Sequence, residues 1–271
     1  GGTGTATSWR AVSAITGSGY DSMGWVPEGQ RSARMSYTTA AKSATFVTLG
    51  EEDQLSFEAE AAAQGFEDLD ATMTLRLLQK MMRKEECGIL GGNASLSLGT
   101  PGTPSLSATG SGATLPGSPT TYSVIVVALT FEGWKNSSLG GGVATSTSFT
   151  GADGNTYSLN AGSSNKSSAA TQAVSLGETL YASVTPVAGA VAYAWYVGAS
   201  GSETLQAITT INSAAFAAPL ASSRQAATAI TADCSANAGL AFDGLLTAAL
   251  NPANNAYVQA LATGTAGTGS T

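Results

Sequence analysis

Histidine is missing from this chain of 271 residues, and charged side chains are scarce. Charged residues make up 11% of the sequence, whereas roughly a quarter of the residues of a typical soluble domain carry charge. Without histidine the chain lacks the commonest general base, the usual zinc ligand and every nucleophile–histidine pair. No other residues supply a catalytic constellation. We therefore expect a protein that is not an enzyme and that holds no metal and no cofactor.

Cysteine, basic charge and long apolar runs are also in short supply. The two cysteines, Cys87 and Cys234, lie in different parts of the chain and cannot build a disulfide framework or a metal-ligand cluster. The formal net charge of -7 argues against a dedicated nucleic-acid binder, which needs a basic face to displace counterions from phosphates. No apolar run approaches the roughly 18 residues of a membrane span. The chain has no initiator Met, so we expect a fragment or a processed chain.

The charges that are present are unevenly placed. Residues 1–90 carry 8 basic and 12 acidic side chains, and residues 91–271 carry 3 basic and 6 acidic ones. The second part is rich instead in Gly, Ala, Ser and Thr. The composition therefore changes near Gly91 and Gly92. The hydrophobic content of 43% is enough for a folded core.

Residues 24–50 predict a long β-hairpin. The sequence WVPEG at 25–29 begins a new element. Residues 31–37 and 44–49 then alternate loosely between apolar and polar, as two extended arms would. The polar residues between these arms, 38–43, are expected to form the tip of the hairpin, which carries Lys42.

The strongest helix signal covers residues 56–90. Ser56 is suited to cap the helix, and acidic residues follow it in the first turn, where the helix dipole favours anions. Apolar residues then recur at steps of three and four, which defines one stripe: Phe66, Leu69, Met73, Leu77 and Met81. Gly91 and Gly92 end the helix. If unbroken, it would be about 50 Å long at 1.5 Å per residue, and Gly65 is the point at which it could bend.

The composition of residues 101–220 predicts a two-sheet β-sandwich. Short extended runs recur there between turn signals. The expected strands are 105–109, 122–131, 143–150, 155–160, 172–176, 180–184, 190–197 and 205–210. Within the seventh, the alternation of Tyr193, Trp195 and Val197 with Ala194 and Tyr196 suggests a strand with one face in a core. Further on, residues 236–249 are compatible with a helix, and 256–261 form another short apolar run.

The order of these elements resembles the major capsid protein of tailed phages, which has the Hong Kong 97 capsid fold. The resemblance rests on the extended arm with Val-Pro-Glu-Gly, on the acidic-then-basic helix, and on its ending RKEECGILGGN at 83–93. In that family the hairpin is the E-loop, here about 24–50, and the helix is the spine helix, here about 56–90. The sequence FDGLL at 242–246 resembles a segment that follows in some members.

A second resemblance concerns the sandwich. Residues 182–198 are similar to fibronectin type III and related immunoglobulin-like domains, which capsid proteins carry as outward-facing insertions. Together the resemblances imply an α+β fold in three parts. Residues 1–100 form the capsid scaffold, 101–220 an inserted all-β immunoglobulin-like sandwich, and 221–271 an incomplete return to the scaffold. The axial domain of the family is not visible.

The capsid resemblance implies a structural protein of the virion that self-assembles into an icosahedral shell around the genome. The implied partners are copies of itself in hexamers and pentamers, together with scaffolding, portal or decoration proteins. The genome would be enclosed without sequence-specific binding, and assembly would occur in the host cytoplasm without a membrane. The sandwich would stabilise the shell or make weak contacts with a host surface or glycan. The alternative is a secreted or cell-surface adhesion protein built on the immunoglobulin-like module.

Eight residues are the expected assembly contacts: Trp25, Glu28, Arg31, Arg34, Lys42, Glu51, Glu52 and Asp53. Each has a simpler interpretation, which stays open here. The three acids form either a solvated charge run or pairs with Arg31 or Arg34 of a neighbouring arm. Such exposed pairs contribute about 0–1 kcal/mol each. The resemblance also raises a covalent cross-link at Lys42, against a plain exposed lysine.

Two further patterns have a binding and a structural interpretation. Asp153-Gly154-Asn155 offers oxygen ligands for calcium, but it is also a strong β-turn signal. The aromatic residues Tyr181, Tyr193, Trp195 and Tyr196 could line a sugar-binding surface. At strand spacing they are more typical of a sandwich core.

Overall fold

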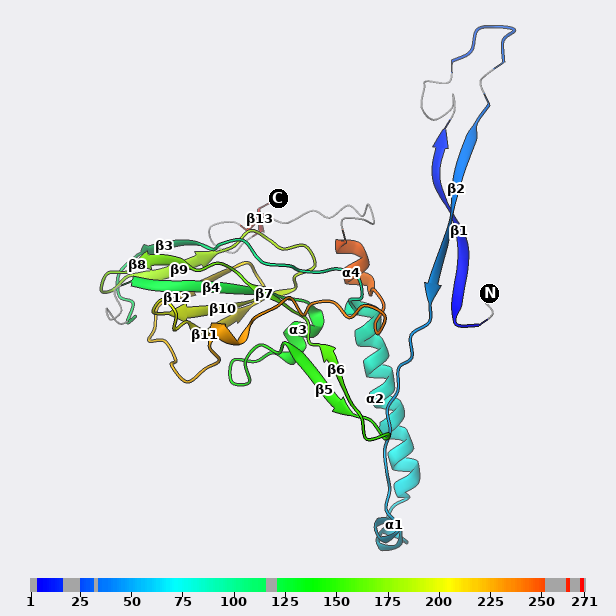
Figure 1. The fold of residues 1–271 in the computed structure, drawn as a ribbon, viewed down its shortest axis with the longest axis horizontal. Coiled ribbons are helices and arrows are strands. Elements are labelled where there is room, and N and C mark those ends of the chain that lie inside the picture. Colours follow the sequence, from blue (N-terminus) through cyan, green and yellow to red (C-terminus); the bar gives the residue numbers. More distant parts are fainter. Residues whose placement is uncertain are drawn as a thin grey trace. The chain divides into compact units, whose positions relative to one another are not determined.

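The computed structural model describes residues 4–16, 25–31, 34–115, 121–251, 262–263 and 269–270 (Figure 1). The chain divides into two units, Gly1–Thr48 and Leu49–Thr271. The described residues form a mixed helix-and-sheet structure in which all paired strands are antiparallel. This agrees with the predicted α+β class and with a β-sandwich.

The first unit is built on a long ribbon of two strands. Strand β1 (Ala6–Thr16) pairs with β2 (Ser36–Thr45), from Ala6 opposite Thr45 to Thr16 opposite Ser36. The expected hairpin with arms at 31–37 and 44–49 is therefore wrong, because its polar tip at 38–43 lies inside β2. That segment contains Ser, Thr, Ala and Lys but no Gly, Pro, Asn or Asp, so it has the polarity of a loop without the residues that turn a chain.

The expected single helix over 56–90 is two helices, α1 (Phe57–Ala63) and α2 (Leu69–Gly91). The predicted cap at Ser56 is confirmed, since the Ala59 amide donates to its hydroxyl at 3.2 Å. Gly65 takes a φ of 92°, in the left-handed region that favours glycine, and ends the first helix. Asp68 then caps the second helix by accepting from the Ala71 amide at 3.0 Å. A positive-φ glycine followed by a new cap explains the break.

The predicted sandwich is present as two antiparallel sheets. The larger sheet has the order β11 (Thr204–Thr209), β10 (Ala192–Gly198), β4 (Thr121–Leu129) and β7 (Ser163–Lys166), and β8 (Ala170–Ala173) also pairs with β4. The smaller sheet has the order β12 (Ser213–Phe216), β9 (Thr179–Ser183) and β3 (Ser105–Thr109). A separate hairpin consists of β5 (Ser146–Thr150) and β6 (Thr156–Asn160).

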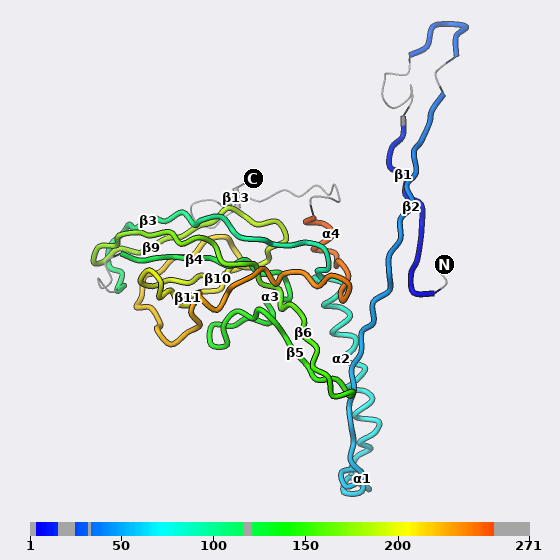
Figure 2. Tube along the Cα trace, viewed as in Figure 1, coloured from blue at the N-terminus to red at the C-terminus, as the bar shows by residue number. Residues whose placement is uncertain are grey.

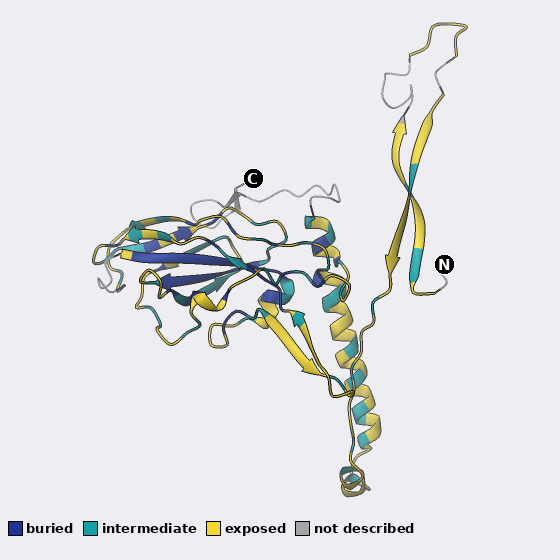
Figure 3. Ribbon diagram, viewed as in Figure 1, coloured by how far each residue is buried: buried dark blue, intermediate teal, exposed yellow. Residues whose placement is uncertain are grey.

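The larger sheet of the sandwich is covered by a hydrophobic core on each of its two faces. The alternation of residues in β10 had predicted a core on one face only. The first core lies between the sheets and contains Trp195 and Val197 from β10 together with Leu180 from β9. The second lies on the other face, where Tyr196 and its neighbours pack against residues from the connecting segments, among them Val143 and Ile230. Strands β4 and β10 are therefore buried along almost their whole length, as the dark ribbons of Figure 3 show.

Two connections depart from the expected strands. The run predicted as a strand over 122–131 ends at Leu129, because Thr130 caps the short helix α3 (Phe131–Asn136), accepting from the Gly133 amide at 3.2 Å. The helix expected over 236–249 forms only at its end, as α4 (Leu245–Leu250). A 3₁₀ turn, η1 (Ala227–Ala229), and the two-residue strands β13 (Ala262–Thr263) and β14 (Gly269–Ser270) complete the described elements. The apolar run at 256–261 lies outside the described residues.

Candidate assembly surfaces

The ribbon of β1 and β2 presents large apolar side chains to solvent. Ile15 lies opposite Tyr37 and Val12 opposite Thr39, so these pairs share one face, and Trp9 lies opposite Lys42 on the other. All four large apolar residues are exposed, Tyr37 to 64% of its surface. No third strand among the described residues pairs with the ribbon. An isolated two-stranded hairpin is marginally stable in water, so this surface is suited to a partner.

The predicted assembly residues of the first unit are all exposed. Trp25 is 86% exposed, and Glu28 lies in a turn in which the Gln30 amide donates to the Pro27 carbonyl at 3.0 Å. Arg31, Arg34 and Lys42 are exposed as well. Lys42 is in the middle of β2 and not at a tip. The two arginines belong to the first unit and the acids at 51–53 to the second, so pairing between them stays a prediction.

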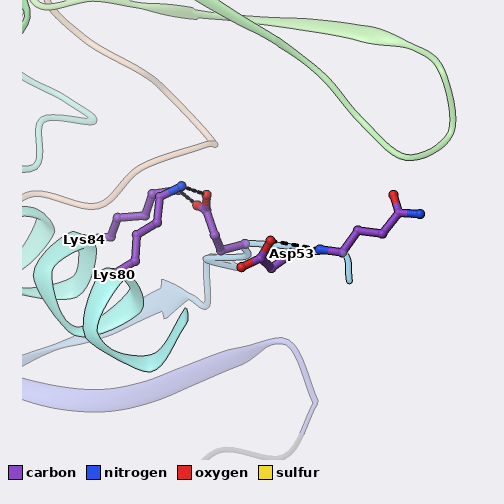
Figure 4. Close-up of polar contacts among 5 residues, drawn as sticks. Asp53, Lys80 and Lys84 are labelled. Atoms are coloured by element: carbon purple, nitrogen blue, oxygen red, sulfur yellow. Dashed lines mark hydrogen bonds and ion pairs between the residues drawn. The ribbon is translucent and has the colours of Figure 1, made fainter. Parts of the chain in front are cut away.

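The three acids at 51–53 do not behave as one solvated run. The Glu51 carboxylate pairs with the ammonium groups of Lys80 and Lys84, one oxygen to each (Figure 4). Its side chain is only 14% exposed. By contrast, Glu52 is exposed, and Asp53 accepts a hydrogen bond from the amide of its neighbour Gln54 at 2.9 Å. Glu51 therefore holds the segment before α1 along α2, which leaves Glu52 and Asp53 for other partners.

Helix α2 has apolar residues on two opposite faces. The predicted stripe is half-buried at Leu69, Met73, Leu77 and Met81, but its first member, Phe66, is 96% exposed and lies before the start of α2. On the other side, Leu75, Leu78, Met82 and Ile89 are exposed. Their spacing of three, four and seven places them on one face of the helix. Sequence reasoning missed this second face, although a search for a second stripe at helical spacing would have found it.

The C-terminal end of α2 meets the returning chain near α4, as the trace in Figure 2 shows. Asp243 accepts from the amides of Ala94 and Ser95 at 2.8 and 3.0 Å. The Gly92 carbonyl accepts from the Gly244 amide at 2.8 Å and from the Thr247 hydroxyl at 2.7 Å. The sequence FDGLL at 242–246 is thus attached directly to the end of the long helix.

A second group of hydrogen bonds joins the two connections to the sandwich. The buried Asn93 donates to the carbonyls of Leu96 and Ser235 at 2.7 and 2.8 Å. Asp233 accepts from the Gly99 amide at 2.8 Å and from the Ser97 hydroxyl. The segment that leaves α2, residues 93–99, is therefore hydrogen-bonded to the segment that returns to it, residues 233–235.

The aromatic residues of the sandwich are mostly core. Trp195 and Tyr196 are fully buried and Tyr193 nearly so, and their polar atoms have partners. Trp195 Nε1 donates to Thr209 Oγ1 at 2.8 Å, and the Tyr196 hydroxyl donates to Gln225 Oε1 at 2.7 Å. Burial raises the pKa of Tyr196 well above its ordinary value. The core interpretation is confirmed for these three, but Tyr181 is 44% exposed on β9.

The hairpin of β5 and β6 carries the predicted turn. Gly154 has a φ of 77°, and Asp153 accepts hydrogen bonds from the amide and the side chain of Asn155 and from the Tyr157 hydroxyl. The turn interpretation of this motif is confirmed. The Tyr157 ring stacks on Phe149 with centroids 5.5 Å apart, and both rings are partly exposed. Sequence reasoning did not single out this aromatic pair.

Comparison with family models, with curated proteins and with solved structures finds no match to this chain. Among the residues that the structure describes, no helix is both long and apolar enough to cross a membrane. Within the same ranges, no group of three or more acidic or cysteine side chains is arranged to hold a metal ion.

Proposed function

We propose that this chain is a structural subunit of a self-assembling shell, with the plan of a tailed-phage major capsid protein of the Hong Kong 97 type. The observation that carries the proposal is the ribbon of β1 and β2, whose large side chains are exposed on both faces. Burying them against a neighbouring subunit would contribute roughly 25 cal/mol for each Å² of apolar surface removed from water. The ribbon is thus an arm that becomes stable by lying on another copy.

The long helix supports the same proposal. Helix α2 packs one apolar face within its own unit and leaves Leu75, Leu78 and Met82 exposed on the other. Exposed contiguous apolar surface of this kind is typical of interaction sites. In the proposed scaffold, α2 is the core of the spine helix and the ribbon takes the place of the E-loop.

The hydrogen bonds at the end of α2 support an insertion. Residues 93–99 and 233–247 are tied together, so the sandwich between them begins and ends at one place on the scaffold. We propose that residues 1–100 belong to the scaffold and that 101–220 are the main part of an inserted immunoglobulin-like domain. The return to the scaffold, expected over 221–271, then begins only near Asp233, because Ala227 and Ile230 lie in the second core of the sandwich. The sandwich would face outward and stabilise the shell or contact a host surface or glycan.

The proposed work of the protein is non-catalytic. Its main partners are further copies in hexamers and pentamers of the virion, with scaffolding, portal or decoration proteins as additional partners. Assembly takes place in the host cytoplasm and not on a membrane. The net charge of -7 is consistent with a shell that encloses its genome without sequence-specific contacts.

A second candidate function rests on the sandwich. Two antiparallel sheets with buried cores on both faces of the larger one form a complete folding unit, as in adhesion modules. A secreted or cell-surface adhesion protein would use this unit for binding. This alternative gives no role to the exposed ribbon or to α2.

The two functions differ in what the ribbon does. We expect the double substitution Ile15→Ser and Tyr37→Ser to abolish higher assemblies, because it removes the apolar pair from one face of the ribbon. Light scattering coupled to size-exclusion chromatography measures the assembled fraction. The matched control is Ser8→Ala with Ser43→Ala, a facing pair of small residues on the same face of the same strands. If both variants assemble like the unchanged chain, the ribbon is not an assembly arm.

A further inference from the structure

The end of α2 is held against helix α3. Phe131, the first residue of α3, packs so closely on Gly91 that a methyl group there would lie 2.5 Å from its ring. Gly133 is equally confined, because a methyl group on it would lie 2.2 Å from the Gly162 carbonyl oxygen. The end of α2 is therefore in close contact with the start of α3, and α3 is itself closely packed on the chain at Gly162.

This contact brings a thiol and an amine together. The Lys135 ammonium donates a hydrogen bond to the Cys87 sulfur, with Nζ 2.7 Å from Sγ. The same Nζ lies over the ring of Phe131, 5.8 Å from its centroid, which is the geometry of a cation–π contact. Two separate interactions thus direct the lysine to the sulfur. Cys87 is half-buried and Lys135 is exposed, so a small oxidant can reach the pair.

We propose that Cys87 and Lys135 are a site of oxidative cross-linking, at which a two-electron oxidant of the peroxide class joins Sγ to Nζ. In the first step, hydrogen peroxide oxidises the thiol to a sulfenic acid and is itself reduced to water. In the second, the Lys135 ammonium first releases one proton to solvent, and the lone pair of the neutral amine then attacks the sulfur, so that an S–N bond forms as the S–O bond breaks. The hydroxyl group leaves with a further proton from the nitrogen as a second water. The product is a sulfenamide that ties α2 to α3.

The Lys135 nitrogen determines whether the sulfenic acid of Cys87 condenses to a sulfenamide or is oxidised further. A sulfenic acid condenses readily with a nucleophile that is already in contact with it, and proceeds to irreversible acids when none is present. Cys234, the other thiol, is a natural comparison. Burial and then the charge of Asp233 raise the pKa of the Cys234 thiol, which makes it less nucleophilic at neutral pH. The site does not depend on shell assembly, so it can be tested whether or not the proposed function is correct.

The linkage is tested by treating the full chain with peroxide, digesting it with trypsin without reductant, and measuring the masses of the peptides. The unlinked chain yields a peptide over 85–135, because trypsin cleaves after Lys84 and Lys135. The linkage blocks cleavage at Lys135, so the expected product is a peptide over 85–166 that is lighter by two hydrogens, about 2 Da. A thiol reductant should restore cleavage, and the linked chain should unfold at a higher temperature than the reduced one.

Two variants make the test specific. Lys135→Arg keeps the positive charge and the cleavage site but lacks the amine, so its 85–135 peptide should carry added oxygen on Cys87 and no linkage. Cys87→Ser should leave cleavage at Lys135 unchanged by peroxide. The inference is overturned if peroxide adds oxygen to Cys87 in the unchanged chain while trypsin still cleaves fully at Lys135. It is also overturned if Lys135→Arg gives the same lighter product.

Discussion

Single polar side chains join parts of this chain that are far apart in the sequence. Backbone amides and carbonyls near the end of a helix lack partners within the helix. Just beyond α2, the Asn93 side chain donates to the carbonyls of Leu96 and Ser235, and the Asp243 carboxylate accepts from the amides of Ala94 and Ser95. Hydrogen bonds to the charged carboxylate of Asp243 contribute about 1.5–3 kcal/mol each and those of the neutral Asn93 amide about 0.5–1.5 kcal/mol, so both residues stabilise the junction. Neither residue could be predicted from the sequence, because nothing local relates position 93 to 235 or 94 to 243.

Asp153 allows a prediction on pH. The hydrogen bond from the Tyr157 hydroxyl, followed by those from Asn155, holds the pKa of its carboxyl below the usual value. The ionised form therefore stabilises the turn above the pKa of the unfolded chain, and this contribution is lost as the pH falls through the folded pKa. We expect Tyr157→Phe to raise the pKa of Asp153, measured by an NMR titration of its carboxyl carbon.

The control for this titration is Phe149→Leu. It disturbs the stacked rings but keeps the Tyr157 hydroxyl, so it should leave the Asp153 titration unchanged. An Asp153 pKa that stays low in Tyr157→Phe would mean that the hydroxyl is not the main cause.

Glu51 illustrates how far a candidate site can be predicted. Lys80 and Lys84 are one turn apart on α2, and this spacing predicts a cationic face. The acids at 51–53 predict an anionic segment. These charges pair because the segment before α1 runs along α2. This is a tertiary contact, which the local sequence does not specify. The sequence therefore identified the charges and not the partner: neither a solvated charge run nor pairing with an arginine of a neighbouring arm describes Glu51, which pairs with Lys80 and Lys84 of its own chain.

At the scale of elements, the strands of the sandwich were the most predictable part. Each expected strand overlaps an observed one, because apolar runs between turn residues reflect burial directly. The missed strands have another composition. Strand β7 has the sequence SSNK and lies at the edge of its sheet, and β1 has the sequence ATSWRAVSAIT, in which small polar and apolar residues are mixed, so neither was predicted as a strand. The pairing of β1 with β2 is a long-range contact that local patterns do not specify.

Packing at the end of α2 gives a prediction on stability. A methyl group on Gly244 would lie 2.7 Å from the Gly88 carbonyl oxygen and 2.8 Å from two backbone nitrogens. These are backbone atoms and cannot move aside as a side chain would. We therefore expect Gly244→Ala to lower the stability by about 1–3 kcal/mol, the usual effect of overpacking. Urea unfolding followed by tryptophan fluorescence measures the change.

Gly102→Ala is the matched control, since a methyl group there meets nothing within 4 Å. It should unfold at nearly the same urea concentration as the unchanged chain. Equal midpoints for Gly244→Ala and Gly102→Ala would show that the junction tolerates separation, and the tight attachment of 242–246 to α2 would have to be abandoned.

For the whole molecule, the uneven charge has a structural explanation in the proposed plan. Residues 1–90 carry most of the charge of the chain, and the ribbon and α2, which lie in this part, are largely exposed, as the yellow ribbons in Figure 3 show. The charge-poor part is mainly a sandwich with two cores, which needs apolar and small residues. The composition thus separates surfaces suited to meeting other subunits from a domain stabilised by its own burial.

The most direct test of the central claim is electron microscopy of the purified chain over a range of concentrations. If the chain is a shell subunit, negative-stain images should contain closed particles or hexameric and pentameric rings. The double substitution Ile15→Ser and Tyr37→Ser should remove them. Discrete monomers at every concentration would contradict self-assembly and favour an adhesion module.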